Sequence, residues 1–247
     1  MKKVQKIGFT IFFLLNFIVT YSQTIILEEG FENTSGLPPG WDEITTTTYP
    51  QWDITEAGNS HYLVVTNHTK YCCLNEGDSD EELPEEYLVT PGIDISSCTT
   101  AYLSFDVFFK GMSYQGLDET FRIEASVNGG STWTMLKTIS GYFNWHRVYC
   151  DLTAYCGNPN LRIAFRYGDG GGWLYGVAID NVKVQTGYSN DVSLDQIQEY
   201  DFVLLNDTVW IKGVIRNLGS SKVHNLTVNW RVGNGNIFTS TLDSLDL

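Results

Sequence analysis

Thr-Phe-Arg-Ile-Glu-Ala-Ser-Val-Asn-Gly-Gly-Ser-Thr-Trp-Thr-Met-Leu-Lys-Thr-Ile, residues 120–139, is the stretch that decides the fold class. Its apolar side chains at Phe121, Ile123 and Ala125 alternate with charged or polar ones, which is the period of a half-buried β-strand. Asn128-Gly-Gly-Ser131 follows as a typical hairpin turn, and a second β-rich run comes after it. The stretch therefore predicts an antiparallel hairpin that covers a hydrophobic core.

The same two-residue period recurs along the chain. Leu161, Ile163 and Phe165 are expected to face a core, whereas Arg162 and Arg166 between them are expected to face outward. No segment with a helical period is longer than a turn or two. We therefore predict an all-β fold, with a jelly-roll β-sandwich as its main domain. The other short β-rich runs of this domain are residues 24–29, 51–54, 62–66, 87–90, 103–108, 145–152 and 173–185.

Composition and charge exclude several classes of function. The chain has 247 residues, with 15 Lys and Arg against 29 Asp and Glu, and a formal net charge of −14. Without the first 22 residues, which contain three lysines and no acid, the charge becomes −17. Nucleic acid and anionic membranes need a cationic face, so we predict neither as a partner. A hydrophobic content of 43% excludes intrinsic disorder.

The first 22 residues have the pattern of a secretory signal peptide. Lys2, Lys3 and Lys6 precede an apolar run from Ile7 to Val19, and small or polar residues up to Ser22 follow. Because the run is short for a membrane span, we predict cleavage and a secreted or cell-surface protein; an uncleaved anchor is the alternative. Beyond the signal, we predict a jelly-roll domain at 23–187 and an incomplete immunoglobulin-like β-sandwich at 190–247, in which the alternating pattern restarts.

Five cysteines agree with export, because disulfides persist outside the cell. Cys150 and Cys156 enclose a short loop, and we predict that they pair. Cys98 could pair with either Cys72 or Cys73, which leaves one thiol over. The alternative is that some of the cysteines are simply small buried apolar residues.

One irregularity suggests chemistry. Val177 and Ile179 set one phase of alternation and Val182 and Val184 set the other, so the slip at Asp180-Asn181 predicts a β-bulge.

The first and last strands of a jelly roll are often neighbours, so Glu28, Glu29, Glu32 and Asp180 could converge at this bulge. Carboxylates that converge repel one another unless a cation lies between them, and oxygen-only ligands suit Ca²⁺. We predict Glu29, Glu32 and Asp180 as metal ligands. The alternative is that Asp180 caps a turn and the glutamates are solvated.

Six motifs together resemble a known family. In chain order they are Glu28-Glu-Gly-Phe-Glu32, Leu37-Pro-Pro-Gly-Trp41, Tyr87-Leu-Val-Thr-Pro91 with Ile93-Asp94, Ser126-Val-Asn-Gly-Gly-Ser-Thr-Trp133, Trp145 with Asp151-Leu-Thr-Ala-Tyr155, and Ile179-Asp-Asn-Val182. They resemble the cleaved-adhesin domains of gingipain-type haemagglutinins, also called the choice-of-anchor J group, which are jelly-roll relatives of MAM domains. The resemblance spans about residues 24–187.

This resemblance implies a bacterial surface adhesin module that is stabilised by structural calcium, is not a catalyst and is exported by type IX secretion. It supports Glu32 and Asp180 as ligands, because both lie in matched motifs. The chain departs from the gingipain adhesins at Ile44–Thr48, where their Asp/Gly-rich repeat is missing, which puts a second metal site in doubt. The alternative function is an accessory region of a larger secreted hydrolase, most simply a peptidase, with its catalytic domain outside this chain.

Aromatic residues beside predicted loops are the candidate ligand contacts. Tyr114, Trp173 and Tyr175 lie there, and such side chains commonly anchor an extracellular protein or glycan. The alternative is that they close the core, as Trp133 and Trp145 are expected to do. The sequence contains no H-E-x-x-H, G-x-S-x-G or phosphate-binding P-loop motif, and its four histidines are dispersed, so we predict no enzyme.

Overall fold

The computed structural model divides the chain into two compact units, Thr24–Thr186 and Met1–Gln23 together with Gly187–Leu247. The part of the chain that it describes comprises residues 4–5, 24–32, 36–46, 52–55, 63–65, 69–75, 85–172, 174–187, 191–197, 203–204, 213–217, 222–231 and 235–245. Within these ranges, no helix is long and apolar enough to cross a membrane.

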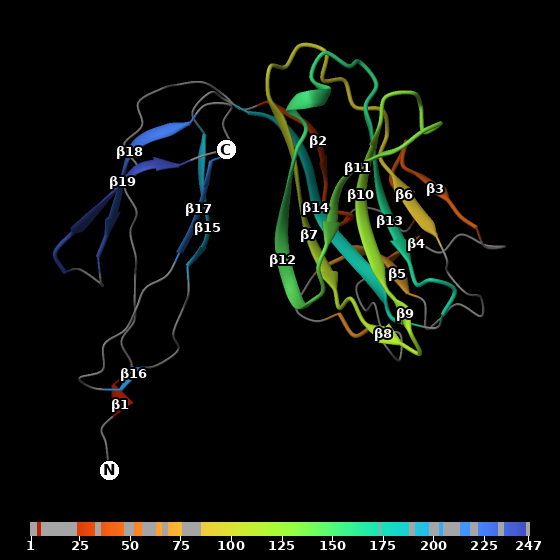
Figure 1. Cartoon of the computed structure of the whole chain (residues 1–247), viewed down its shortest axis with the longest axis horizontal. Coiled ribbons are helices and arrows are strands. Elements are labelled where there is room, and N and C mark those ends of the chain that lie inside the picture. Colours follow the sequence, from red (N-terminus) through yellow and green to blue (C-terminus); the bar gives the residue numbers. More distant parts are fainter. Residues whose placement is uncertain are drawn as a thin grey trace. The chain divides into compact units, whose positions relative to one another are not determined.

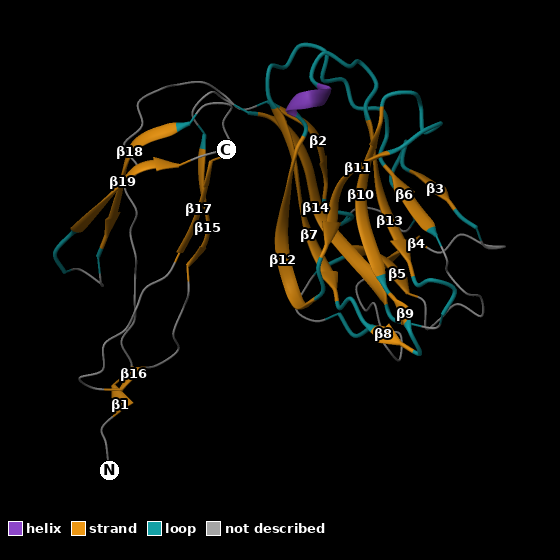
Figure 2. Ribbon diagram, viewed as in Figure 1, coloured by secondary structure: helices purple, strands orange, loops and turns teal. Residues whose placement is uncertain are grey.

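The Thr24–Thr186 unit is a sandwich of two antiparallel sheets (Figures 1 and 2). One sheet has the order β11-β10-β13-β6-β3, and the other has the order β12-β7-β14-β5-β4, with β2 also paired to β14. The all-β prediction is confirmed. The strands of the first sheet are β11 (Thr134–Ile139), β10 (Thr120–Ser126), β13 (Arg162–Gly168), β6 (Glu86–Val89) and β3 (Asp42–Ile44). Those of the second are β12 (Tyr142–Asp151), β7 (Ala101–Phe109), β14 (Gly176–Thr186), β5 (Tyr71–Asn75), β4 (Trp52–Thr55) and β2 (Ile25–Glu29).

Alternation builds the core as the sequence predicts. In β10 and β13, Phe121, Ile123, Ile163 and Phe165 are fully buried between the sheets. The ring of Phe105 in β7 meets the ring of Phe165 edge to face at 5.0 Å, so one aromatic pair joins the two layers. Burying one face of each sheet in this way is the main force that holds such a sandwich together.

The predicted hairpin between β10 and β11 is present, and its turn is fixed by side chains. The Gly130 N–H donates to Ser126 Oγ (2.9 Å), and the Thr132 N–H donates to Asn128 Oδ1 (3.0 Å). Trp133, which follows this turn, does not lie in the core as expected. It is half-buried, and its ring lies beside that of Tyr87, which the pairing of β6 with β13 places on the outer side of the sheet.

The second unit contains short antiparallel pairs. β15 (Val192–Ile197) pairs with β17 (Gly213–Asn217), and β18 (Val223–Trp230) pairs with β19 (Phe238–Leu245). β1 (Val4–Gln5), within the predicted signal peptide, pairs with β16 (Val203–Leu204). The signal peptide and the immunoglobulin-like assignment of residues 190–247 stay predictions.

The predicted pairing of Cys150 with Cys156 is wrong. Cys156 bonds instead to Cys98, and the Cα atoms of the pair are 5.5 Å apart. A 3₁₀ helix, Thr153–Tyr155, turns the chain after β12, and the Gly157 N–H then donates to the Ile95 carbonyl (2.9 Å). This bond brings Cys156 beside Cys98.

The position of Cys150 is determined by β12, the strand that precedes the 3₁₀ helix. Cys150 faces the core from β12 with Val148, and it is buried and outside the disulfide, as are Cys72 and Cys73. Burial raises the pKa of the Cys150 thiol to about 11, which keeps it protonated and unreactive at neutral pH.

Peptide mapping of the unreduced protein tests this pairing. We expect one linked pair of peptides that contains Cys98 and Cys156, and alkylation of Cys150 only after unfolding. Cys98→Ser is expected to lower the free energy of unfolding by about 4 kcal/mol, because the bond closes a long loop. Cys150→Ser is the control and leaves the linked peptide in place. A Cys150–Cys156 peptide would contradict the assignment.

Candidate functional site

The predicted bulge in β14 is confirmed, and it lies where this strand changes partner. Residues Gly176–Ile179 pair with β5, whereas Val182–Gln185 pair with β2. On its other edge, the register of β14 against β7 shifts between Asp180 and Lys183. The bulge thus lies between the ends of β5 and β2, and the predicted neighbourhood of the first and last strands is also correct.

Two residues at this junction have unusual backbone conformations. Phe31 has φ of 55° and Asn181 has φ of 49°, a region that side chains other than glycine rarely adopt. Phe31 is fully buried against the ring of Trp41, which holds it in place. Strain of this kind persists only where the surrounding structure enforces it, and it is concentrated at functional sites.

Asp180 is buried at the bulge, with 1% of its surface exposed. Its Oδ1 accepts the Asn181 N–H at 2.6 Å. The pKa of Asp180 is raised from 3.8 to about 7, mainly by burial and also by the Asp106 and Glu32 carboxylates, against the opposing effect of this hydrogen bond. The site therefore favours a positive charge or a proton at Asp180.

The glycine between β2 and Glu32 leaves room at the centre of this group. A Cβ on Gly30 would lie 3.8 Å from Asn181 Oδ1 and 4.0 Å from both Asp180 Oδ1 and Glu32 Cγ. Side chains from β14 and from the turn after β2 thus lie next to Gly30. We refer to Glu32, Asp106, Asp180 and Asn181 as the bulge cluster.

Asp106 of β7 is already neutralised in part. Arg147 donates to it through two nitrogens, Nε to Oδ1 at 2.5 Å and Nη2 to Oδ2 at 2.8 Å. Asn181 Nδ2 also donates to Asp106 Oδ2 at 2.9 Å. The carboxamide oxygen of Asn181, Oδ1, lies next to Gly30.

The structure brings two of the three predicted metal ligands close together and gives the third a structural hydrogen bond. Glu32 and Asp180 lie near each other, as predicted. Glu29 lies opposite Val182, and its Oε1 accepts the Phe31 N–H at 2.6 Å, so this carboxylate supports the strained turn. In the part of the chain that the structure describes, no group of three or more His, Cys, Asp or Glu side chains forms an arrangement that could hold a metal.

A second candidate region lies at the end of the sandwich opposite the 3₁₀ helix, at the small hairpin of β8 (Ser113–Tyr114) and β9 (Leu117–Asp118) (Figure 2). The Tyr114 side chain is 58% exposed at this hairpin. Tyr175 is half-buried just before β14, with Lys110 Nζ 5.0 Å from the centre of its ring. Trp173 lies outside the described residues.

Glu119 fixes both parts of this region. Its Oε2 accepts the Met112 N–H (2.8 Å), and its Oε1 accepts the Tyr167 hydroxyl (2.9 Å) and the N–H groups of Tyr175 and Gly176 (both 2.8 Å). The carboxylate is 7% exposed. It ties the β8–β9 hairpin to β13 and β14, so Tyr114 is presented on a firmly held loop. Sequence reasoning missed Glu119, and no motif marks it.

Comparisons with known proteins agree with this fold. No protein-family model matches the sequence, and no curated protein sequence matches it. The K1 cleaved adhesin domain of Lys-gingipain from Porphyromonas gingivalis W83 is similar at 22% identity, over 65% of this chain and 98% of that domain, with a TM-score of 0.48.

Other solved structures are similar to a comparable degree. A cyclase from Fischerella sp. TAU matches at 18% identity, over 66% of this chain and 97% of its own, with a TM-score of 0.45. The carbohydrate-binding module TmCBM61, solved with β-1,4-galactotriose, matches at 13% identity, over 65% and 97%, with a TM-score of 0.42. Each of these similarities is a likeness of fold at low sequence identity, and none assigns a ligand or an activity to this chain.

Proposed function

We propose that this chain is a non-catalytic binding module, secreted or held at the cell surface, that contacts an extracellular protein or glycan. The observation that carries the proposal is the exposed Tyr114 on a hairpin anchored by the buried Glu119 carboxylate. A rigid, exposed aromatic ring binds a partner at little cost in conformational entropy. The Lys110 amine lies 5.0 Å from the centre of the ring of Tyr175, whose backbone N–H the same Glu119 carboxylate binds.

We further propose that the bulge cluster binds structural calcium. Glu32, Asp180 and the Oδ1 of Asn181 would hold the ion, together with backbone carbonyl oxygens or water. The donor set consists of oxygens, and the Asp106 and Glu32 carboxylates act on the buried Asp180, so the residues present fit Ca²⁺ better than a softer metal. Bound calcium would supply charge compensation and would fix the Phe31 turn. Glu29 supports this turn by its hydrogen bond to the Phe31 N–H.

The second candidate function is that this chain is the accessory region of a larger secreted hydrolase. Such a region would have the same fold and the same binding surface as the proposed module. An open reading frame with a peptidase domain beside residues 1–247 would favour it. Under either candidate, we propose export by the type IX route. Signal cleavage after Ser22 is testable by mass spectrometry of the N-terminal peptide of the secreted protein, which we expect to begin at Gln23.

A binding screen of the full chain against glycans and matrix proteins tests the proposed function. We expect at least one ligand, and we expect Tyr114→Ala to weaken its binding by roughly tenfold, as for a typical aromatic contact. The melting temperature should not change, because the ring is exposed. Val127→Ala is the matched control, since Val127 is 53% exposed on another loop. A ligand bound equally by both variants would remove Tyr114 from the proposal.

A further inference from the structure

The outer surface of the five-stranded sheet carries three of the four arginines of the Thr24–Thr186 unit. Arg122 lies opposite Arg166 in the register of β10 and β13, and Arg162 lies opposite Ser126. Their neighbours along each strand are buried in the core, so all three side chains lie on the outer side. Arg162 and Arg166 are four residues apart, about 13 Å along the strand.

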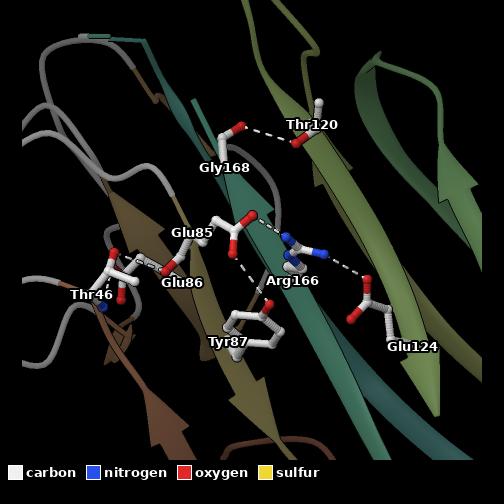
Figure 3. Close-up of polar contacts among 8 residues, drawn as sticks. All are labelled: Thr46, Glu85, Glu86, Tyr87, Thr120, Glu124, Arg166 and Gly168. Atoms are coloured by element: carbon white, nitrogen blue, oxygen red, sulfur yellow. Dashed lines mark hydrogen bonds and ion pairs between the residues drawn. The ribbon is translucent and has the colours of Figure 1, made fainter. Parts of the chain in front are cut away.

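Arg166 is the one arginine of this surface that is already paired. Figure 3 shows its guanidinium between two carboxylates, with Nη1 2.9 Å from Glu124 Oε1 and Nη2 bonded to Glu85. The same guanidinium lies 5.2 Å from the centre of the Tyr87 ring. Arg166 and its two acids therefore hold this ring in position, and together they carry a formal charge of −1.

Arg122 and Arg162 have no such acids. Within the described residues, neither guanidinium has a hydrogen bond or an ion pair, and Arg162 Nε is buried without a partner. Both side chains are half-buried, and Arg122 directly faces another arginine. Like charges opposite each other destabilise a sheet, and a half-buried cation without a partner is costly. Together with Glu85 and Glu124, the three arginines give this surface a formal charge of +1, in a chain with a net charge of −14.

Aromatic and apolar side chains lie beside these arginines. The rings of Tyr87 and Trp133 are 6.3 Å apart and tilted by 34°. Ile44, opposite Tyr87, is 42% exposed, and Met135, opposite Glu124, is 60% exposed. The surface thus combines aromatic rings with guanidinium groups that are not engaged by the protein.

We propose that this arginine–aromatic face binds an acidic polysaccharide whose sugar rings carry carboxylates, a polyuronate. Each uronate ring has an apolar face that packs on Tyr87 and Trp133 and a carboxylate that fits the planar fork of Arg122 or Arg162. A neutral glycan would leave both guanidiniums unpaired, and nucleic acid would need a far more cationic protein. The inference rests on the proposed binding function but places the ligand on a surface separate from Tyr114.

Affinity measurements on the full chain test this inference. The probes are polygalacturonate, alginate and hyaluronan, with methyl-esterified polygalacturonate as the uncharged version of the first polymer. We expect binding to at least one polyuronate that weakens with added salt. If that polymer is polygalacturonate, methyl esterification should weaken binding at least tenfold. Binding to none of the polyuronates would overturn the inference.

Variants locate the site. Arg162→Gln and Arg122→Gln should each weaken polyuronate binding roughly tenfold or more, the effect of one charge-assisted contact. The control is Lys183→Gln, which removes an equal charge from a surface ion pair with Glu28, and it should bind like wild type. Circular dichroism checks that each variant is folded. If Arg162→Gln unfolds the chain, Arg122→Gln tests the site instead.

The outcomes separate the two proposals. If Tyr114→Ala abolishes polyuronate binding while both arginine variants retain it, the arginine–aromatic face is not the site and the proposed function stands. If the chain binds only a neutral glycan or a protein, the same conclusion follows. If it binds nothing in either screen, both proposals fail.

Discussion

Glu119→Ala is expected to lower the free energy of unfolding of the sandwich by about 4 kcal/mol, the largest effect that we predict for one side chain. The substitution leaves three backbone N–H groups and the Tyr167 hydroxyl without their acceptor. A buried donor without a partner costs about 1–3 kcal/mol, and such costs are less than additive in one network. A loss of this size corresponds to roughly 10 °C in melting temperature for a domain of this length.

Two further variants make this expectation specific. Glu119→Gln keeps one oxygen acceptor and loses the other, so about half of the effect should remain. Glu28→Ala removes an exposed glutamate from its ion pair with Lys183, and it should change the free energy by less than about 1 kcal/mol. Differential scanning calorimetry of the full chain measures all three. A Glu119→Ala transition within 1 °C of wild type would show that the carboxylate does not hold the hairpin.

Asp180 is expected to make the metal-free sandwich less stable as the pH rises from about 4 to about 7. The pKa of Asp180 is about 7 in the folded chain and 3.8 as its ordinary value, so in this window the folded state binds the proton more tightly. The stabilisation by that proton is complete below pH 4 and is lost by pH 7. Its size is on the order of a few kcal/mol, because burial is the main cause of the shift.

Calcium is expected to reverse this dependence, since it binds the ionised carboxylate. At pH 7.5, removal of divalent ions with EDTA should lower the melting temperature, and added Ca²⁺ should restore it. Asp180→Asn should flatten the pH profile and abolish the response to Ca²⁺. Asp151→Asn, at an exposed position on β12, is the control and should keep both. A wild-type melting curve that EDTA leaves unchanged at pH 7.5 would count against the calcium site.

The features that sequence predicted are those that local alternation determines. The bulge at Asp180 appears as a change of phase between Ile179 and Val182, and the outward direction of Arg162 and Arg166 follows from their buried neighbours. A two-residue period carries this information without knowledge of which strands pair.

Contacts between distant segments could not be predicted in the same way. Cys98 and Cys156 are separated by 58 residues, and the backbone hydrogen bonds of Ile95 with Gly157 and Asn158 bring them together. The four hydrogen bonds of Glu119 likewise come from three separate segments. Trp133 was expected in the core because aromatic residues are mostly buried, but the turn before it directs the ring to Tyr87.

The central claim, binding without chemical conversion, is tested most directly by following one ligand through binding and recovery. A ligand from the screens is titrated into the full chain by calorimetry, incubated at saturation with Ca²⁺, and then analysed by mass spectrometry. We predict a saturable heat of binding and a ligand recovered with unchanged mass. A cleaved or otherwise converted ligand, absent from a matched sample without protein, would contradict the account.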